Sequence, residues 1–109
     1  MDHRKIEERS LALHREIAIK IRENPSLLLD VKQRLEDAVG SERHSESVKD
    51  ALREWFDILD HKPVSEIIEL LIDPGEEAAR LRQSSPFAGI LSEAERRTVF
   101  NRFYESARV

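Results

Sequence analysis

The sequence predicts an all-α protein: one compact domain built from five or six short helices. Apolar residues recur at spacings of three and four along successive stretches, the pattern of helices with one buried side. Proline, serine or asparagine stands at the start of most of these stretches, where helix caps are expected. The chain shows no β-hairpin signal, no internal repeat and no low-complexity tract. With 109 residues, it has the size of a single domain, and we assign residues 1–109 to one helical domain.

Composition narrows the class of protein further. Charged residues make up 37% of the chain and the net charge is −4, which argues against a protein that mainly coats DNA or an anionic membrane. There is no cysteine, so disulfides and thiolate metal sites are excluded. The N-terminal residues MDHRKIEERS lack the apolar run of a signal peptide, and no apolar stretch approaches the ~18 residues of a membrane span. We expect a cytoplasmic protein.

The most strongly amphipathic stretch is 48–59, VKDALREWFDIL. Its apolar residues fall within roughly 160° of a helical wheel, which is more than one neighbouring helix can cover. We therefore expect this helix to be central and to pack on two or more others, with the only tryptophan, Trp55, in the middle of the core. Ser47 and Asp50 resemble a capping box at its start.

The remaining helices are predicted from the same signals. The first covers about 2–23, and its Leu11 and Ile19 lie off the main apolar stripe, where they would face another helix of this chain or a second subunit. The others cover about 25–39, with Asn24 as the N-cap, then 64–72, 75–83 and a last helix ending near 106. Ser92 and Glu95 have the S-x-x-E spacing of a capping box that opens this last helix.

Signatures of catalysis are missing from the sequence. It has no glycine-rich phosphate loop, no H-E-x-x-H, no G-x-S-x-G and no cysteine nucleophile. The four histidines are scattered; His3 and His14, with help from Glu7, are the one arrangement that could hold a metal, and a satisfied or solvent-facing histidine is far more common. His61, near Asp57 and Asp60, fits favourable electrostatics at a helix end. We predict no enzymatic activity, no cofactor and no metal.

DNA binding is the alternative function that the sequence supports. Residues 64–83 have the length of a helix-turn-helix unit with its turn at 73–75. The second helix would present Arg80, Arg82 and Gln83 to phosphates and base edges. Glu76 and Glu77, in the turn that should approach the groove, would repel phosphate and weaken this interpretation.

Protein binding is the favoured function, and it depends on the C-terminal third. Residues 76–109 contain six arginines against five glutamates, and four of the six aromatic residues of the chain. Arginine and aromatic residues dominate the energetics of protein interfaces. We expect the following residues to form a surface for a protein partner or for a homodimer: Phe87, Ile90, Arg96, Arg97, Phe100 and Tyr104. In the competing interpretation, Phe87 and Ile90 plug the open end of the helical core and Phe100 docks on Trp55.

Two segments carry a resemblance to known proteins. Residues 9–18, RSLALHREIA, and 81–97, LRQSSPFAGILSEAERR, resemble small bacterial proteins of poorly defined function that are suspected of an antitoxin-like or accessory role. The resemblance covers about a quarter of the chain and includes no catalytic motif. It implies a small helical cytosolic protein that works by binding another protein. Ordinary antitoxins often add a long disordered tail, which this sequence does not have.

Overall fold

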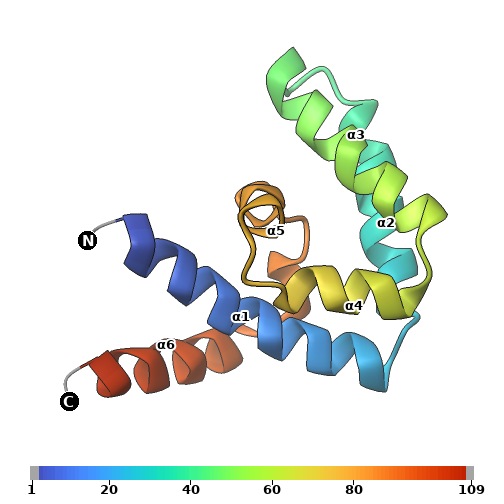
Figure 1. Ribbon diagram of the computed structural model, residues 1–109. Helices are drawn as coiled ribbons and strands as arrows, with labels where there is room; N and C mark the ends of the chain where they lie inside the picture. Colours follow the sequence, from blue (N-terminus) through green and yellow to red (C-terminus); the bar gives the residue numbers. More distant parts are fainter. Residues whose placement is uncertain (1–2, 108–109) are drawn as a thin grey trace.

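The chain folds into six α-helices and one short 3-10 helix, seen here in a computed structural model that describes residues 3–107 (Figure 1). No β-strand occurs within these residues, and the predicted all-α class is confirmed. The molecule measures about 45 × 31 × 26 Å. The elements are α1 (His3–Glu23), α2 (Leu27–Val39), α3 (Glu46–His61), α4 (Val64–Ile72), α5 (Glu76–Arg82), η1 (Ala88–Ile90) and α6 (Glu93–Ala107).

The helix on which the others pack is α1. Helices α4, α5 and α6 all contact it, and its buried side carries Ile17, Ala18 and Ile21, each no more than 3% exposed. Figure 1 shows α6 alongside α1, with the beginning of α1 and the end of α6 at the same end of the molecule. The expectation that 48–59 forms the central helix is therefore wrong: α3 lies mainly along α2.

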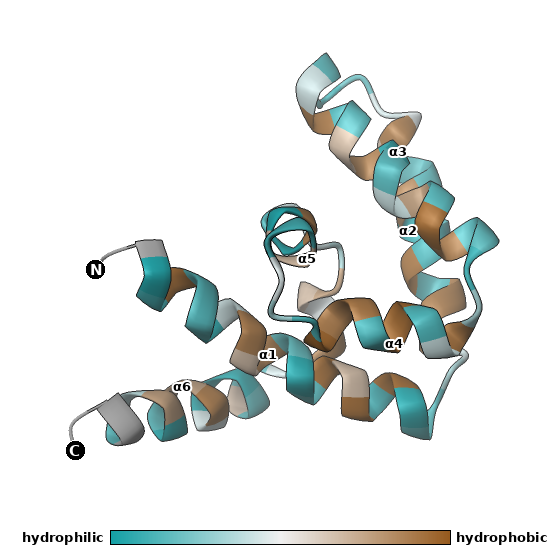
Figure 2. Cartoon of the chain, viewed as in Figure 1, coloured by the Kyte–Doolittle hydropathy of each residue, from teal (hydrophilic) through white to brown (hydrophobic). Residues whose placement is uncertain are grey.

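Helices α2 and α3 form a hairpin that extends away from the other helices (Figure 1). Because only α2 runs alongside α3, most of the wide apolar side of α3 is half-buried, and Trp55 is its one fully buried residue. Figure 2 shows the result in colour: α4 is hydrophobic over most of its length, whereas the hairpin alternates between hydrophobic and hydrophilic residues. On the first helix, Leu11 is half-buried and Ile19 is 45% exposed.

Local caps agree with the sequence at one helix start and differ at two. Ser92 and Glu95 form the predicted capping box: Glu95 N donates to Ser92 Oγ at 3.1 Å, and Ser92 N donates to Glu95 Oε1 at 2.9 Å. Helix α3 instead begins two residues earlier than expected: Ser45 is its N-cap and accepts a hydrogen bond from Val48 N, so Ser47 lies inside the helix. Helix α2 begins at Leu27 with Ser26 in the N-cap position, so Asn24 is not the cap that the sequence predicts, and residues 24–26 form a turn before the helix.

The core connects the hairpin to the α1 layer through Trp55. Its indole Nε1–H donates to the carbonyl oxygen of Leu81 at 2.9 Å, which satisfies the one polar atom of a side chain that is 0% exposed. The ring of Phe87 meets it edge to face, with centroids 5.1 Å apart. Trp55 therefore does lie in the core, as predicted, although its helix is not the central one.

Candidate functional site

The six residues predicted to bind a partner do not lie together. Arg96, Arg97 and Tyr104 are exposed on α6, and Phe100 is half-buried beside them. Ile90, at the end of η1, is half-buried and packs against the core. These residues therefore remain candidates for a binding surface, with α6 carrying most of them.

Phe87 has a different place. It is 0% exposed and its ring is enclosed beside Trp55, so it cannot contribute to a surface. The segment before it turns inward: Ser85 Oγ accepts a hydrogen bond from Phe87 N at 3.3 Å, which bends the chain around Pro86. Phe87 is thus a plug of the core, and its assignment to the partner-binding surface is corrected. Phe100, in contrast, stacks on an arginine of α1 and not on Trp55.

The exposed end of α6 is organised by Arg9 of α1. The Arg9 guanidinium lies 5.3 Å from the centre of the Phe100 ring, and its Nη1 donates to the hydroxyl of Tyr104 at 3.2 Å. Phe103 meets Tyr104 edge to face at 5.5 Å between centroids. These contacts hold the flexible Arg9 side chain and the rings of Phe100 and Tyr104 in defined positions on the surface.

Ion pairs align α6 antiparallel to α1. Lys20 Nζ lies 2.5 Å from Glu95 Oε1, and this pair, together with the cap at Ser92, lowers the pKa of Glu95 to about 2. Lys20 Nζ also donates to the carbonyl oxygen of Ile90 at 3.3 Å. Further along, Arg102 reaches Glu16 at 3.3 Å. The position of α6 on α1 is therefore set by charge as well as by the burial of Val99, which is 5% exposed.

A small cavity of about 80 Å³ lies where α1, α6 and the segment after α5 meet. Its lining is mostly apolar, with Arg96 as the charged member and no carboxylate among the described residues that form it. Arg97, its neighbour, pairs with Glu93 at 3.6 Å. The residues that line the cavity are Leu13, His14, Ile17, Ser85, Ala88, Leu91 and Arg96.

His14 forms the polar floor of this cavity. Its Nδ1 is 2.7 Å from the carbonyl oxygen of Ser10, which can only accept, so Nδ1 carries the proton. Nε2 is therefore an acceptor, and the Ser85 hydroxyl donates to it at 2.7 Å. Burial, with a smaller contribution from the charge of Arg82, lowers the pKa of His14 below its ordinary value of 6.5, although the bond to Ser10 opposes this shift.

No local motif could have revealed this pair, because His14 and Ser85 are 71 residues apart in the chain. The sequence grouped His14 only with His3 and Glu7, as a weak candidate for a metal site. The side chain of His3 lies outside the described residues. Within the described part of the chain, no group of three or more histidine, aspartate or glutamate residues is arranged to hold a metal ion.

The residues proposed for DNA contact are engaged elsewhere, apart from Gln83, which is exposed. Arg80 forms a two-pronged pair with Glu54, at 2.9 and 3.1 Å, and a further pair with Glu77. This arrangement joins α5 to α3 and neutralises the arginine charge. Helix α4 and helix α5 are connected through 73–75 as expected, but the pairing leaves little positive charge on the second helix.

Arg82 is an internal group, only 6% exposed. Its Nη1 donates to the carbonyl oxygens of Leu70, Leu71 and Asp73, at 3.3, 3.4 and 2.6 Å. Carbonyls at the end of a helix have no partner within the helix, so Arg82 acts as a cap for α4. Burial lowers the pKa of its guanidinium, and the charges of Asp73 and Glu7 oppose this effect.

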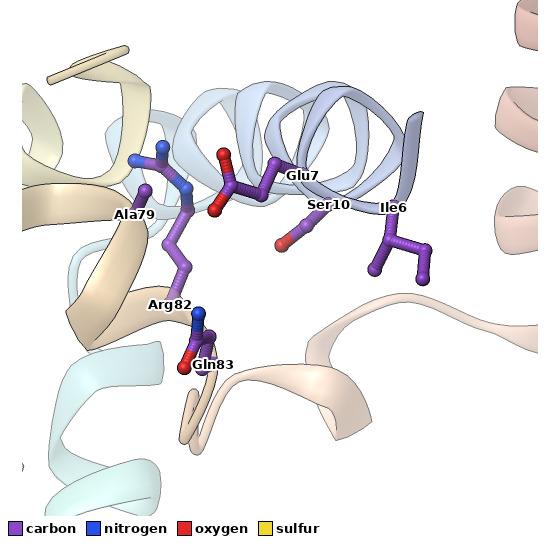
Figure 3. A pocket seen from close by; sticks show the side chains of 6 residues that line it. All are labelled: Ile6, Glu7, Ser10, Ala79, Arg82 and Gln83. Atoms are coloured by element: carbon purple, nitrogen blue, oxygen red, sulfur yellow. The ribbon is translucent and has the colours of Figure 1, made fainter. Parts of the chain in front are cut away.

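A second, larger cavity of about 330 Å³ opens between α1 and α5, lined by Ile6, Glu7, Ser10, Ala79, Arg82 and Gln83 (Figure 3). Figure 3 shows Glu7 and Ser10 on the α1 side, with Arg82 and Gln83 across from them and Ile6 at the outer end. Ile6 is 43% exposed, which extends the accessible apolar surface of α1 beyond the cavity.

Comparisons with protein-family models, with curated proteins and with solved structures found no match to this chain. Among residues 3–107, none of the helices combines the length and the apolar character needed to cross a bilayer. Inferences about function therefore depend on the geometry described above.

Proposed function

We propose that this chain is a helical protein–protein interaction module whose partner docks on α1 and α6. The observation that carries the proposal is the ordered arginine–aromatic cluster on the outside of α6. We call this surface the α1–α6 face and define it by residues of the two helices: Ile6, Arg9, Leu13, Arg96, Phe100 and Tyr104.

The chemistry of the α1–α6 face is that of an interface anchor. Tyr104 is 39% exposed and Ile6 is 43% exposed, while Phe100 keeps part of its ring accessible. Aromatic and arginine side chains bury large areas on binding and retain polar groups for specificity. Arg9 is already positioned by Phe100 and Tyr104, so a partner would lose less side-chain entropy in ordering it.

The packing of α6 supports the same proposal. Its main neighbour is α1, so the side of α6 that carries Arg97 and Tyr104 is left without a covering helix. A partner helix or strand laid against that side would complete the burial of the aromatic cluster. The partner can be a different protein or a second copy of this chain, and an antitoxin-like or other regulatory role in a bacterial cytoplasm is the form of this function that we propose.

Site-specific photocrosslinking in the native host tests the proposal. A benzophenone amino acid replaces Phe100 in one variant and Leu29 in a matched control; Leu29 is on α2 and is 69% exposed. We expect a discrete crosslinked product from position 100 that is absent from position 29 and is weakened by Arg9→Ala. A product of twice the chain mass identifies a homodimer. Equal crosslinking from both positions, or none from position 100, contradicts the proposal.

An antitoxin-like role adds a genetic expectation. A gene next to the one that encodes this chain should be toxic when expressed alone, and coexpression should relieve the toxicity. Variants with Phe100→Ala and Tyr104→Ala should lose that relief while remaining folded. A neighbourhood without any toxic gene would leave binding intact as a function but remove this role.

DNA binding through α4 and α5 receives less support. Of the arginines on α5 that would contact DNA, Arg80 is paired with two glutamates and Arg82 donates to main-chain carbonyls. Binding of this kind would weaken steeply with salt. A fluorescence-anisotropy titration with genomic fragments at low salt distinguishes it, since the α1–α6 proposal predicts no binding in that assay.

A further inference from the structure

The hydrogen-bonded chain Ser10–His14–Ser85 has the geometry of an activated serine. We propose that Ser85 is a nucleophile, that His14 is its general base, and that the 80 Å³ cavity beside them takes the acyl group of a small ester. This activity is additional to protein binding and does not depend on it. Local sequence motifs do not reveal it, because His14 and Ser85 meet only in the folded chain.

The distances fit the roles. A serine nucleophile needs a base within hydrogen-bond reach, and the base needs a third group that fixes its tautomer and orientation. Ser85 Oγ lies 2.7 Å from His14 Nε2, and the carbonyl of Ser10 lies 2.7 Å from Nδ1. The carbonyl takes the place that a carboxylate holds in a three-residue triad. The imidazole is neutral near pH 7, the form that a base requires, because burial lowers its pKa.

Access comes from the cavity. Ser85 is half-buried, and both Ser85 and His14 line the same opening, so a reacting carbonyl carbon can approach the hydroxyl. The apolar walls, which include Leu13 and Leu91, suit a hydrocarbon acyl chain. The cavity volume is about 80 Å³, and one water molecule needs only about 10–15 Å³ on the same measure, so the cavity has room for a short acyl group.

Charge indicates the class of ester. Arg96 is the cationic group at the cavity, and no carboxylate lines it among the described residues. An ester that carries a carboxylate or phosphate on its alcohol part would pair with the guanidinium as the acyl group enters. The main-chain N–H of Phe87 donates to Ser85 Oγ at 3.3 Å, which helps to fix the position of this oxygen at the cavity.

The reaction balances without a redox partner. Ser85 Oγ bonds to the carbonyl carbon while its proton moves to His14 Nε2. The bond to the alcohol oxygen then breaks, and the alcohol leaves with the proton from His14. Water attacks the resulting acyl-serine and gives its proton to the same nitrogen, which returns it to Ser85 Oγ as the carboxylic acid leaves.

Covalent labelling of the intact protein tests this proposal. The probe is a fluorophosphonate, and peptide mass spectrometry measures the labelling rate of each serine. We expect Ser85 to be labelled selectively, and His14→Gln to slow that labelling by about 100-fold or more, the usual contribution of a general base. Ser84→Ala is the matched control: Ser84 is adjacent and half-buried, but its hydroxyl bonds to the carbonyl of Leu81, and its loss should leave the labelling of Ser85 unchanged.

A pH profile gives a readout that does not depend on a variant remaining folded. The labelling rate of Ser85 should fall as His14 becomes protonated, with a midpoint below the ordinary histidine pKa of 6.5, while circular dichroism shows the protein still folded. Hydrolysis of p-nitrophenyl acetate with an initial burst, abolished by Ser85→Ala, should accompany it. Labelling spread evenly over the serines, or a rate at Ser85 that His14→Gln leaves unchanged, would overturn the proposal without affecting the crosslinking result expected for the α1–α6 face.

Discussion

Replacing Phe87 with alanine should remove a large part of the stability of this fold. The side chain is 0% exposed and meets the fully buried Trp55 ring edge to face. Truncating a buried phenylalanine typically costs about 3–5 kcal/mol, from lost burial and from the cavity left behind. A domain of this size has a total unfolding free energy on the order of 5–15 kcal/mol. The variant should therefore be marginally folded.

Urea unfolding measures this loss. Trp55 is the only tryptophan, so its fluorescence reports directly on the core, and circular dichroism at 222 nm checks the helices independently. With a slope of about 1.5 kcal/mol per molar urea, a loss of ~4 kcal/mol lowers the midpoint by about 2–3 M. Both probes should show the same shift.

Phe100→Ala is the matched control for this prediction. It removes the same side chain from a half-buried position on α6, where the Arg9 guanidinium is the ring's polar neighbour. Its cost should be about 1–2 kcal/mol, because less apolar area is lost and the surface site can relax. The reasoning is refuted if Phe87→Ala lowers the midpoint by no more than Phe100→Ala does.

Three further predictions concern buried or paired polar groups. Arg82→Met should lower the unfolding free energy by about 1–3 kcal/mol, because carbonyls at the end of α4 lose their donor. Urea unfolding measures this loss, which should be smaller for Arg80→Met because the ion pairs of Arg80 are exposed to solvent. The pKa of His14 is lower in the folded chain than in the unfolded chain. The unfolding free energy should therefore fall as the pH drops below about 6.5 and level off below the folded pKa. A series of urea midpoints at different pH values checks this, and His14→Gln should remove this part of the pH dependence. NMR titration should find the Glu95 pKa at about 2, so that its stabilisation is lost as the pH falls from 4.5 toward 2, and Lys20→Met should raise that pKa.

Features that depend on neighbours in the chain could be predicted well. The helix opened by Ser92 and Glu95 follows from their spacing alone, since the two residues cap each other within one turn. The start of α3 shows the limit of such signals. Ser41, Ser45 and Ser47 lie within seven residues at this point, and the choice of Ser45 over Ser47 as the cap depends on where the chain leaves α2, which spacing does not encode.

The periodicity of apolar residues also could not predict which helix lies at the centre of the fold. The stretch 48–59 is the most strongly amphipathic, yet α1, with a narrower apolar stripe, is the helix that three others contact. The width of an apolar stripe reports how much surface a helix would bury if it were surrounded. The number of neighbours that a helix has depends on how the connections direct the other helices, and residues 40–45 turn α3 back along α2.

The sequence by itself determined the helical class, the approximate helix ranges and the burial of Trp55, because these follow from spacing along one chain. Only the tertiary structure decided that Phe87 is enclosed while Tyr104 is exposed, and that His14 meets Ser85. Exposure and contact depend on which surfaces of distant segments face one another. Phe87 and Tyr104 both belong to the aromatic-rich C-terminal third, but Phe87 is enclosed beside Trp55 whereas Tyr104 lies on the exposed side of α6.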